Sequence, residues 1–143
     1  MAAEYIAACG EQIDEMILTR TDILRLCRIG ENSEVEFKSA KGGFPKEFWK
    51  SFSAFANSEG GKIVLGVTQK QDSFYPDGLT LLELARLRKQ FWDDAHNRSK
   101  VSHSLLSEQD VQDIDLGDGR WVLVFSIPRA KYQIRPVYLT ENP

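Results

Sequence analysis

The sequence is poor in the residues from which metal and redox sites are built. It has only two cysteines, Cys9 and Cys27, and two histidines, His96 and His103. No CxxC pair occurs, and no third or fourth ligand lies at the spacing that zinc sites use. The sequence therefore predicts no metal site and no cofactor, and its two cysteines favour a cytoplasmic location, where thiols stay reduced.

Long hydrophobic runs are missing as well. No run of about 18 apolar residues is present, so the sequence predicts no membrane-spanning helix. The N-terminus lacks the basic start and long apolar core of a secretion signal. There is also no GxxxxGK[ST] loop between a strand and a helix, which argues against a nucleoside triphosphate site. No Ser/His/Asp or Cys/His arrangement indicates nucleophilic catalysis.

What the chain has is the composition of one globular domain. Its 143 residues are 42% hydrophobic and include eight Phe, four Tyr and three Trp, enough for one core. The formal net charge is −3, and residues 1–17 hold four acids and no basic residue. Total charge therefore neither favours nor excludes a nucleic-acid partner. We expect a leader with a helical pattern over 1–18 and one domain over 19–143.

The first half of the domain shows the patterns of an α+β fold. N-cap chemistry at its start and Gly30 after its end predict a helix over 20–29. Residues 34–38 alternate between polar and apolar and predict a half-buried strand. Segment 45–56 begins with a proline suited to the first helical position and continues as an apolar helix face. The β-branched run 63–67 predicts a buried strand.

The second half adds a helix and a hairpin. Residues 68–78 predict a turn-rich loop, and a capping box predicts a helix over 80–95. Residues 111–115 and 121–127 flank a Gly-Asp-Gly turn and predict a hairpin, and 136–139 predicts a short edge strand. We expect the core to contain Phe48, Phe52, Phe55, Ile63, Leu65, Val67, Leu84, Phe91, Val122 and Val124.

Acidic residues near the first predicted strand are one candidate site. Glu34, Glu36 and Lys38 lie two positions apart and so share one face of the strand. Together with Glu31, two carboxylates could hold a divalent metal against a phosphodiester. The alternative is a solvated strand face with local charge pairing, and spacing alone favours it.

The glycine pair that follows the predicted helix 45–56 is a second candidate site. Asn57, Gly60 and Gly61 lie between a predicted helix and a buried strand. Their backbone amides could meet a phosphate. The alternative is a structural turn, in which at least one of the two glycines has a positive φ.

Two groups of basic residues are the third candidate. They are Arg86, Arg88 and Lys89, and then Arg129, Lys131 and Arg135. Basic residues with Tyr132 between them suit a phosphate backbone and a stacked base. A solvated helix face and a polar edge are the alternative. Residues 108–118 hold five acids and no base, so we expect that hairpin to face away from a nucleic acid.

Taken in order, these motifs resemble a known family. Glu31 and the EFK of 36–38 precede the SAFANSEGG of 53–61 and the IVLGV of 63–67. This series is similar to the Schlafen-type AlbA-like family, which is described as DNA-binding. Two later segments, Ile-Pro-Arg-Ala and Arg-Pro-Val-Tyr, resemble the end of the same family, so the resemblance covers about residues 19–140.

The resemblance implies an α+β fold with a mixed sheet. In bacteria such domains open longer proteins described as transcriptional regulators, and the end of this chain just after a strand-like segment predicts a fragment of such a protein. Some animal members cleave RNA, and Glu31 and Glu36 match their catalytic positions. Their third acid follows the GV strand, where this sequence has Thr68, and that difference argues against cleavage.

We therefore predict a nucleic-acid-binding module of a bacterial transcriptional regulator, non-enzymatic in this fragment, with DNA as a partner before RNA. The six basic residues named above are its expected binding residues. One alternative is a metal-dependent nuclease that uses Glu31 and Glu36. The other is a protein-interaction module, for which a homodimer is an option.

Overall fold

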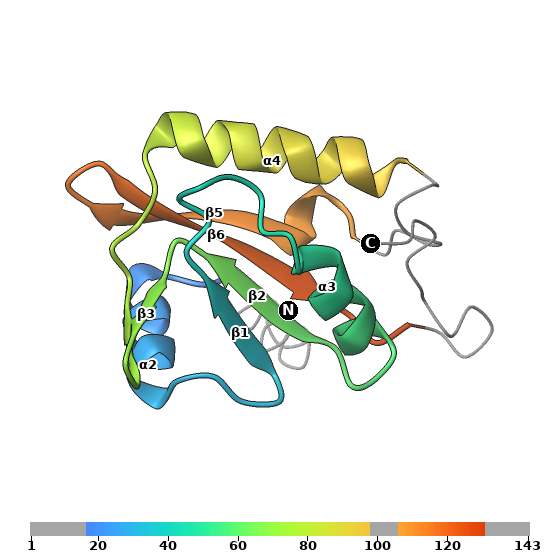
Figure 1. Cartoon of the computed structure of the whole chain (residues 1–143), viewed down its shortest axis with the longest axis horizontal. Coiled ribbons are helices and arrows are strands. Elements are labelled where there is room, and N and C mark those ends of the chain that lie inside the picture. Colours follow the sequence, from blue (N-terminus) through green and yellow to red (C-terminus); the bar gives the residue numbers. More distant parts are fainter. Residues whose placement is uncertain (1–16, 98–105, 131–143) are drawn as a thin grey trace, which may run out of the picture.

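A four-stranded mixed sheet organises this computed structural model, which describes residues 17–97 and 106–130 (Figure 1). The strand order is β1-β2-β6-β5, with the bounds β1 Val35–Lys38, β2 Gly61–Leu65, β5 Val111–Gly117 and β6 Arg120–Ile127. Strand β1 pairs with β2 in parallel, whereas β6 pairs with both β2 and β5 in the antiparallel direction. The predicted α+β class with a mixed sheet is confirmed.

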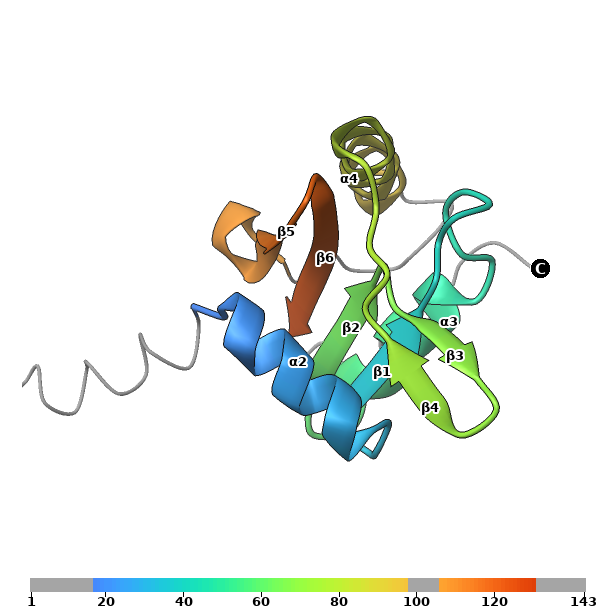
Figure 2. The same ribbon diagram turned by 90° about the vertical axis from the view of Figure 1, so that its left-hand side faces the viewer.

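Helices cover both faces of this sheet. They are α2 Arg20–Ile29, α3 Phe48–Ala56 and α4 Leu81–Ala95, and a short 3-10 helix, η1 Glu108–Asp110, precedes β5. Helices α3 and α4 pack on one face and α2 packs on the other, as the turned view in Figure 2 shows. Each face has its own cluster of buried apolar side chains. The sheet is therefore buried on both sides.

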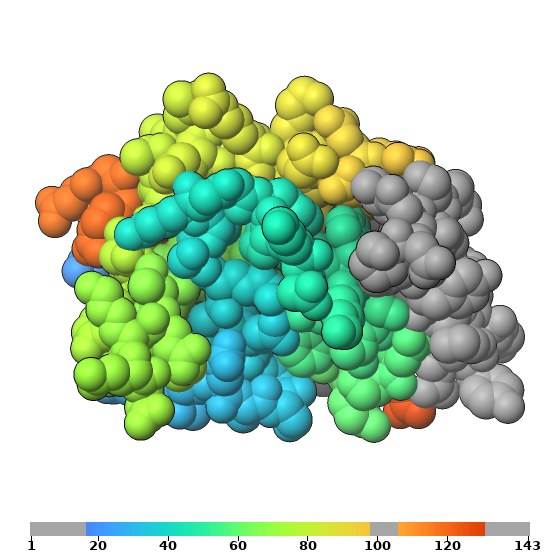
Figure 3. Space-filling model, in the orientation of Figure 1, coloured from blue at the N-terminus to red at the C-terminus, as the bar shows by residue number. Residues whose placement is uncertain are grey.

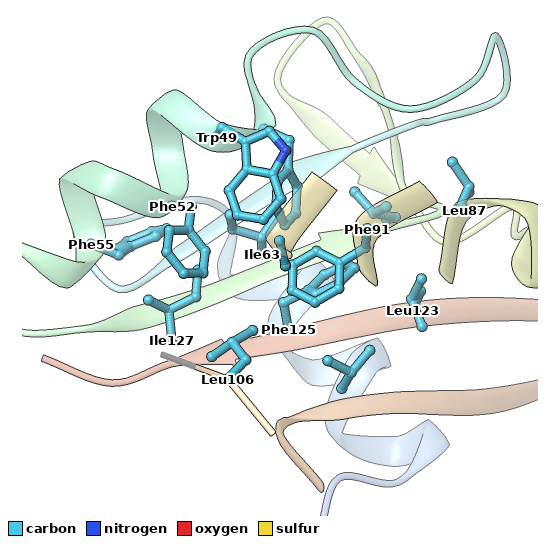
Figure 4. Close-up of a cluster of buried hydrophobic side chains, with 14 of the residues drawn as sticks. Trp49, Phe52, Phe55, Ile63, Leu87, Phe91, Leu106, Leu123, Phe125 and Ile127 are labelled. Atoms are coloured by element: carbon cyan, nitrogen blue, oxygen red, sulfur yellow. The ribbon is translucent and has the colours of Figure 1, made fainter. Parts of the chain in front are cut away.

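The two central strands supply side chains to both clusters. Ile63 and Phe125 point to the cluster under α3 and α4, which Figure 4 shows in close-up, while their neighbours Val64 and Val124 point to the cluster under α2. This follows from the two-residue period of a strand. All ten predicted core residues are buried.

Local capping chemistry determines where two of the helices begin. Thr19 and Thr80 are N-caps that form capping boxes with Asp22 and Glu83, respectively. Gly30 has φ of 91°, a left-handed value that glycine adopts readily, and ends α2. Helices 20–29 and 81–95 thus have nearly the bounds that the sequence predicted.

Two local predictions were wrong. Helix α3 begins at Phe48 rather than at Pro45, because Pro45 lies in a preceding turn whose carbonyl accepts the N–H of Phe48 at 3.2 Å. The expected loop 68–78 contains a hairpin of two short strands, β3 Thr68–Lys70 and β4 Ser73–Tyr75. Each of these strands has only three residues, too few for a period-two pattern to be read.

Several predictions fall outside the described residues. These are residues 1–16 of the predicted leader over 1–18, the strand over 136–139, and the basic residues Lys131 and Arg135. Among the helices of the described ranges, none is long and apolar enough to cross a membrane.

Candidate nucleic-acid interface

The glycine pair forms a tight turn between α3 and β2. Gly60 has φ of 84°, the positive value expected for at least one of the pair, and its N–H donates to the carbonyl of Phe55 at 2.9 Å. A Cβ at Gly60 would lie 2.6 Å from the carbonyl oxygen of Ile127, and one at Gly61 would overlap the ring of Phe55. Asn57 is the C-cap residue of α3. The glycines therefore permit close packing, and the Gly60 amide is already used within the fold.

The two glutamates of the nuclease alternative have partners within the protein. Glu31 Oε2 accepts the backbone N–H of Phe37 at 3.0 Å. Glu36 Oε2 accepts from Ser51 Oγ at 2.8 Å and lies 2.7 Å from Lys38 Nζ. In the ranges 17–97 and 106–130, no three acidic, histidine or cysteine side chains form a group that could hold a metal.

Near the end of β2, a carboxylate from farther along the chain lies beside Thr68. Thr68 Oγ1 donates to the Asp77 carboxylate at 2.9 Å, and Lys41 Nζ forms an ion pair with the same carboxylate. Partial burial acts to raise the pKa of Asp77, but the hydrogen bonds from Lys41 and Thr68 hold that pKa below its usual value. Asp77 thus stays ionised as a counter-charge for Lys41.

The basic residues of α4 differ in their surroundings. Arg88 Nη2 lies 2.6 Å from Asp113 Oδ1 and donates to the carbonyl of Val111 at 3.1 Å, while Arg88 Nη1 lies 3.4 Å from Glu108. Arg88 therefore links α4 to the acidic segment around β5. Lys89 is exposed and pairs with Asp93 one turn along the helix, and this hydrogen bond raises the pKa of Lys89.

Arg129 lies elsewhere in the molecule, just after β6. Its guanidinium is 3.7 Å from Glu59, beside the glycine turn, and its side chain is exposed. The structure therefore does not gather the described members of the predicted set into one patch. It places Arg88 against the β5 side and Arg129 beyond the end of β6.

Arg86 lines a groove that sequence reasoning missed. The groove lies between α4 and loop 40–44, has a volume of about 370 Å³, and is lined from the loop by Lys41, Gly42, Gly43 and Phe44. Figure 3 shows the teal loop lying against the yellow helix at the surface. Arg86 is exposed and makes no ion pair or hydrogen bond with another described residue. The available signal was the Lys-Gly-Gly-Phe sequence, in which a basic residue, two glycines with open backbone and an aromatic residue follow one another.

Acidic groups near this groove have partners of their own. Glu83 lines it from α4, but its carboxylate accepts the N–H of Thr80 at 2.9 Å in the capping box. Asp77 pairs with Lys41. The groove thus has one basic side chain on each wall: Lys41, which is paired with Asp77, comes from the loop, and Arg86 comes from α4.

Comparisons with known proteins place the chain in a family. A search of curated proteins finds no significant match. A solved structure with the same fold is the solution NMR structure of the N-terminal domain of "Putative ATP-dependent DNA helicase RecG-related protein" from Nitrosomonas europaea. The two share 22% sequence identity and a TM-score of 0.69, over 89% of this chain and 84% of that one. The profile of the Schlafen, AlbA_2 family matches residues 31–142, so this chain belongs to that family.

Proposed function

We propose that this chain is a nucleic-acid-binding module of a larger bacterial regulator of the cytoplasm, with DNA as its partner before RNA. Membership of the Schlafen, AlbA_2 family supports an association with nucleic acid. The fold is also that of an N-terminal domain from a protein whose name contains the words DNA helicase.

The observation that carries the proposal is the groove between α4 and loop 40–44, which has a basic side chain on each wall. Arg86 and Lys41 line it from opposite sides, and both side chains are exposed. Positive charges on both walls of a groove suit a phosphate backbone, whose charge supplies most of non-specific nucleic-acid affinity. Lys89 and Arg129 are secondary candidates because both are exposed and each has a single ion pair among the residues of 17–97 and 106–130.

Cleavage has less support than binding. Glu31 and Glu36 are the residues of the nuclease alternative, and each already accepts a hydrogen bond from the protein. Magnesium needs near-octahedral oxygen ligands and is usually bound by one or two free carboxylates together with substrate phosphate. We therefore propose that the module binds without cutting.

The test is a titration of labelled duplex and single-stranded DNA at several salt concentrations. We expect Lys41→Ala and Arg86→Ala each to weaken binding and to flatten the plot of log K against log[salt] by roughly one unit. Arg25→Ala is the matched control, since Arg25 is an exposed arginine on α2, which packs on the opposite face of the sheet. Arg129→Ala combined with Lys131→Ala tests the second basic segment in the same way.

The glutamates separate binding from cleavage. Glu31→Gln with Glu36→Gln should leave binding unchanged or tighten it, because two negative charges are removed. A nuclease would show the reverse, with magnesium- or manganese-dependent cutting that this pair abolishes. If no duplex or single strand binds at low salt, the proposal is rejected and an interaction module becomes the better hypothesis.

A further inference from the structure

The groove between loop 40–44 and α4 has features that go beyond a generic basic surface. Its volume of about 370 Å³ falls at the lower end of the range for small-molecule sites, about 300–1,000 Å³. The groove can thus hold one small group, such as a single nucleotide, but it does not offer an extended surface for a rigid duplex. A duplex keeps its bases stacked inside and offers only its outer phosphates to such a groove.

The loop is held at both ends while its tip stays open. Ala40 is buried in the core cluster, and Phe44 packs on it through contacts with Phe48, at a centroid distance of 4.8 Å, and Trp49. Gly43 N–H donates to the carbonyl of Ala40 at 3.3 Å, which closes the turn. The loop is therefore fixed before a ligand arrives, so binding costs little ordering entropy.

The tip presents backbone rather than side chains. A Cβ at Gly42 or at Gly43 would meet no atom within 4 Å, so the space beside both is open. Gly42 N–H makes no hydrogen bond with another described residue and is free to donate to an anion. Lys41, from the loop, and Arg86, from α4, line the same groove as this open backbone.

Phe44 adds an apolar surface next to these cations. It is half-buried, with one side on the core and the rest lining the groove. Aromatic side chains beside basic residues are the usual means of holding single strands, because each base can stack on a ring.

We propose that this groove holds one nucleotide of a single-stranded nucleic acid, with its phosphate between Lys41 and Arg86 and its base against Phe44. The inference rests on the proposed function and narrows it from nucleic acid in general to unpaired strands. Asp77 lowers the affinity of the groove for phosphate, because its carboxylate neutralises Lys41 when no phosphate is present.

The experiment compares three fluorescently labelled probes on the full chain: oligothymidylate, oligouridylate and a mixed-sequence duplex. Both single strands should bind more tightly than the duplex, and the tighter of the two identifies DNA or RNA as the preferred ligand.

Phe44→Leu keeps an apolar side chain but removes the ring face, so single-strand affinity should fall about tenfold while duplex affinity is unchanged. Phe44→Tyr keeps the ring and should preserve affinity, which guards against a fold defect in the leucine variant. Asp77→Asn should tighten single-strand binding several-fold, because Lys41 loses its counter-charge.

The outcomes separate the two proposals. If all three probes bind but Phe44→Leu affects none of them, or if the duplex binds as tightly as the single strands, this inference is overturned while nucleic-acid binding stands. If no probe binds, both proposals fail.

Discussion

Arg86 and Arg88 lie two positions apart on α4, and their side chains serve different purposes. Successive helical residues are separated by 100°, so these two point to different sides of the helix. Arg86 lines the groove opposite loop 40–44, whereas Arg88 contacts acids near β5 and is only 26% exposed. Basic residues that look equivalent in the sequence thus divide into one available for a ligand and one that stabilises the fold.

Replacing Arg88 should therefore affect stability more than binding. Arg88→Ala removes hydrogen bonds to Asp113 and to the carbonyl of Val111, and we expect a loss of about 1–3 kcal/mol in the free energy of unfolding, measured in urea. Lys89→Ala is the matched control and should leave stability unchanged, because its exposed pair with Asp93 is screened by solvent. A large loss of nucleic-acid affinity in folded Arg88→Ala would contradict this division.

Gly60 is the glycine whose replacement should be most costly. Its φ of 84° is left-handed, and a Cβ would lie 2.6 Å from the Ile127 carbonyl oxygen. Gly60→Ala should lower the unfolding free energy by about 1–3 kcal/mol through backbone strain. Gly42→Ala is the control, since no atom lies within 4 Å of its Cβ position and its φ is not left-handed, so unfolding should be unchanged. Equal urea midpoints of unfolding for Gly60→Ala and Gly42→Ala would contradict this, because the turn at Gly60 would then accept a Cβ without a loss of stability.

Cys27 should be unreactive in the folded protein. Burial between α2 and the sheet raises the pKa of its thiol to about 11. At pH 8 only about one thiol in a thousand is then a thiolate, the form that reacts. In a Cys9→Ser background, iodoacetamide should modify Cys27 far more slowly in the native state than in urea. Rapid native labelling at pH 8 would show that α2 opens readily.

The same shift makes stability depend on pH in the alkaline range. An unfolded thiol ionises near about 8.5, below the folded value, so the folded state binds more protons between the two. The unfolding free energy should therefore decrease as the pH rises from about 8.5 towards 11, and Cys27→Ala should reduce that slope.

The edge strands of the sheet, β1 and β5, determine whether two copies of the chain could dimerise by pairing strands edge to edge. On β1, the N–H of Phe37 is taken by Glu31, and the carbonyl of Val35 accepts from Asn32 at 3.2 Å. On β5, a second copy would bring the acids of 108–118 against their own copies. Occupied edge groups and like charges are common means of blocking edge-to-edge pairing. Sheet extension is therefore an unfavourable route to the homodimer alternative.

A helix or strand could be predicted from the sequence when the residues that determine it lie close together in the chain. The bounds of α2 and the start of α4 follow from capping residues three positions apart, and β6 follows from its apolar run. The hairpin β3–β4 lacks such a pattern. At the site, the partners of Arg88 and Lys41 lie 25 and 36 positions away, so neither contact has a local signal. The groove itself arises from two segments that meet only in the fold.

At the scale of the whole molecule, the sheet couples two hydrophobic clusters. The cluster under α3 and α4 includes Trp49 and Phe52, whereas the cluster under α2 includes Ile23. Strands β2 and β6 contribute alternate residues to both. Loss of either cluster would expose one face of the same two strands, so neither should persist alone.

This coupling predicts a single cooperative unfolding transition. Phe52 and Ile23 are both fully buried, at 0% exposure, so Phe52→Ala should cost about 3–5 kcal/mol and Ile23→Ala about 2–5 kcal/mol. Leu82→Ala, at an exposed position on α4, is the control and should have little effect. Tryptophan fluorescence, to which Trp49 contributes from the α3 side, and far-UV circular dichroism should give the same midpoint in urea for each variant. The decisive variant is Ile23→Ala, because its cavity lies on the face opposite Trp49. If its circular dichroism changed at a lower urea concentration than its fluorescence, α2 would be unfolding separately, and the sheet would not couple the two clusters.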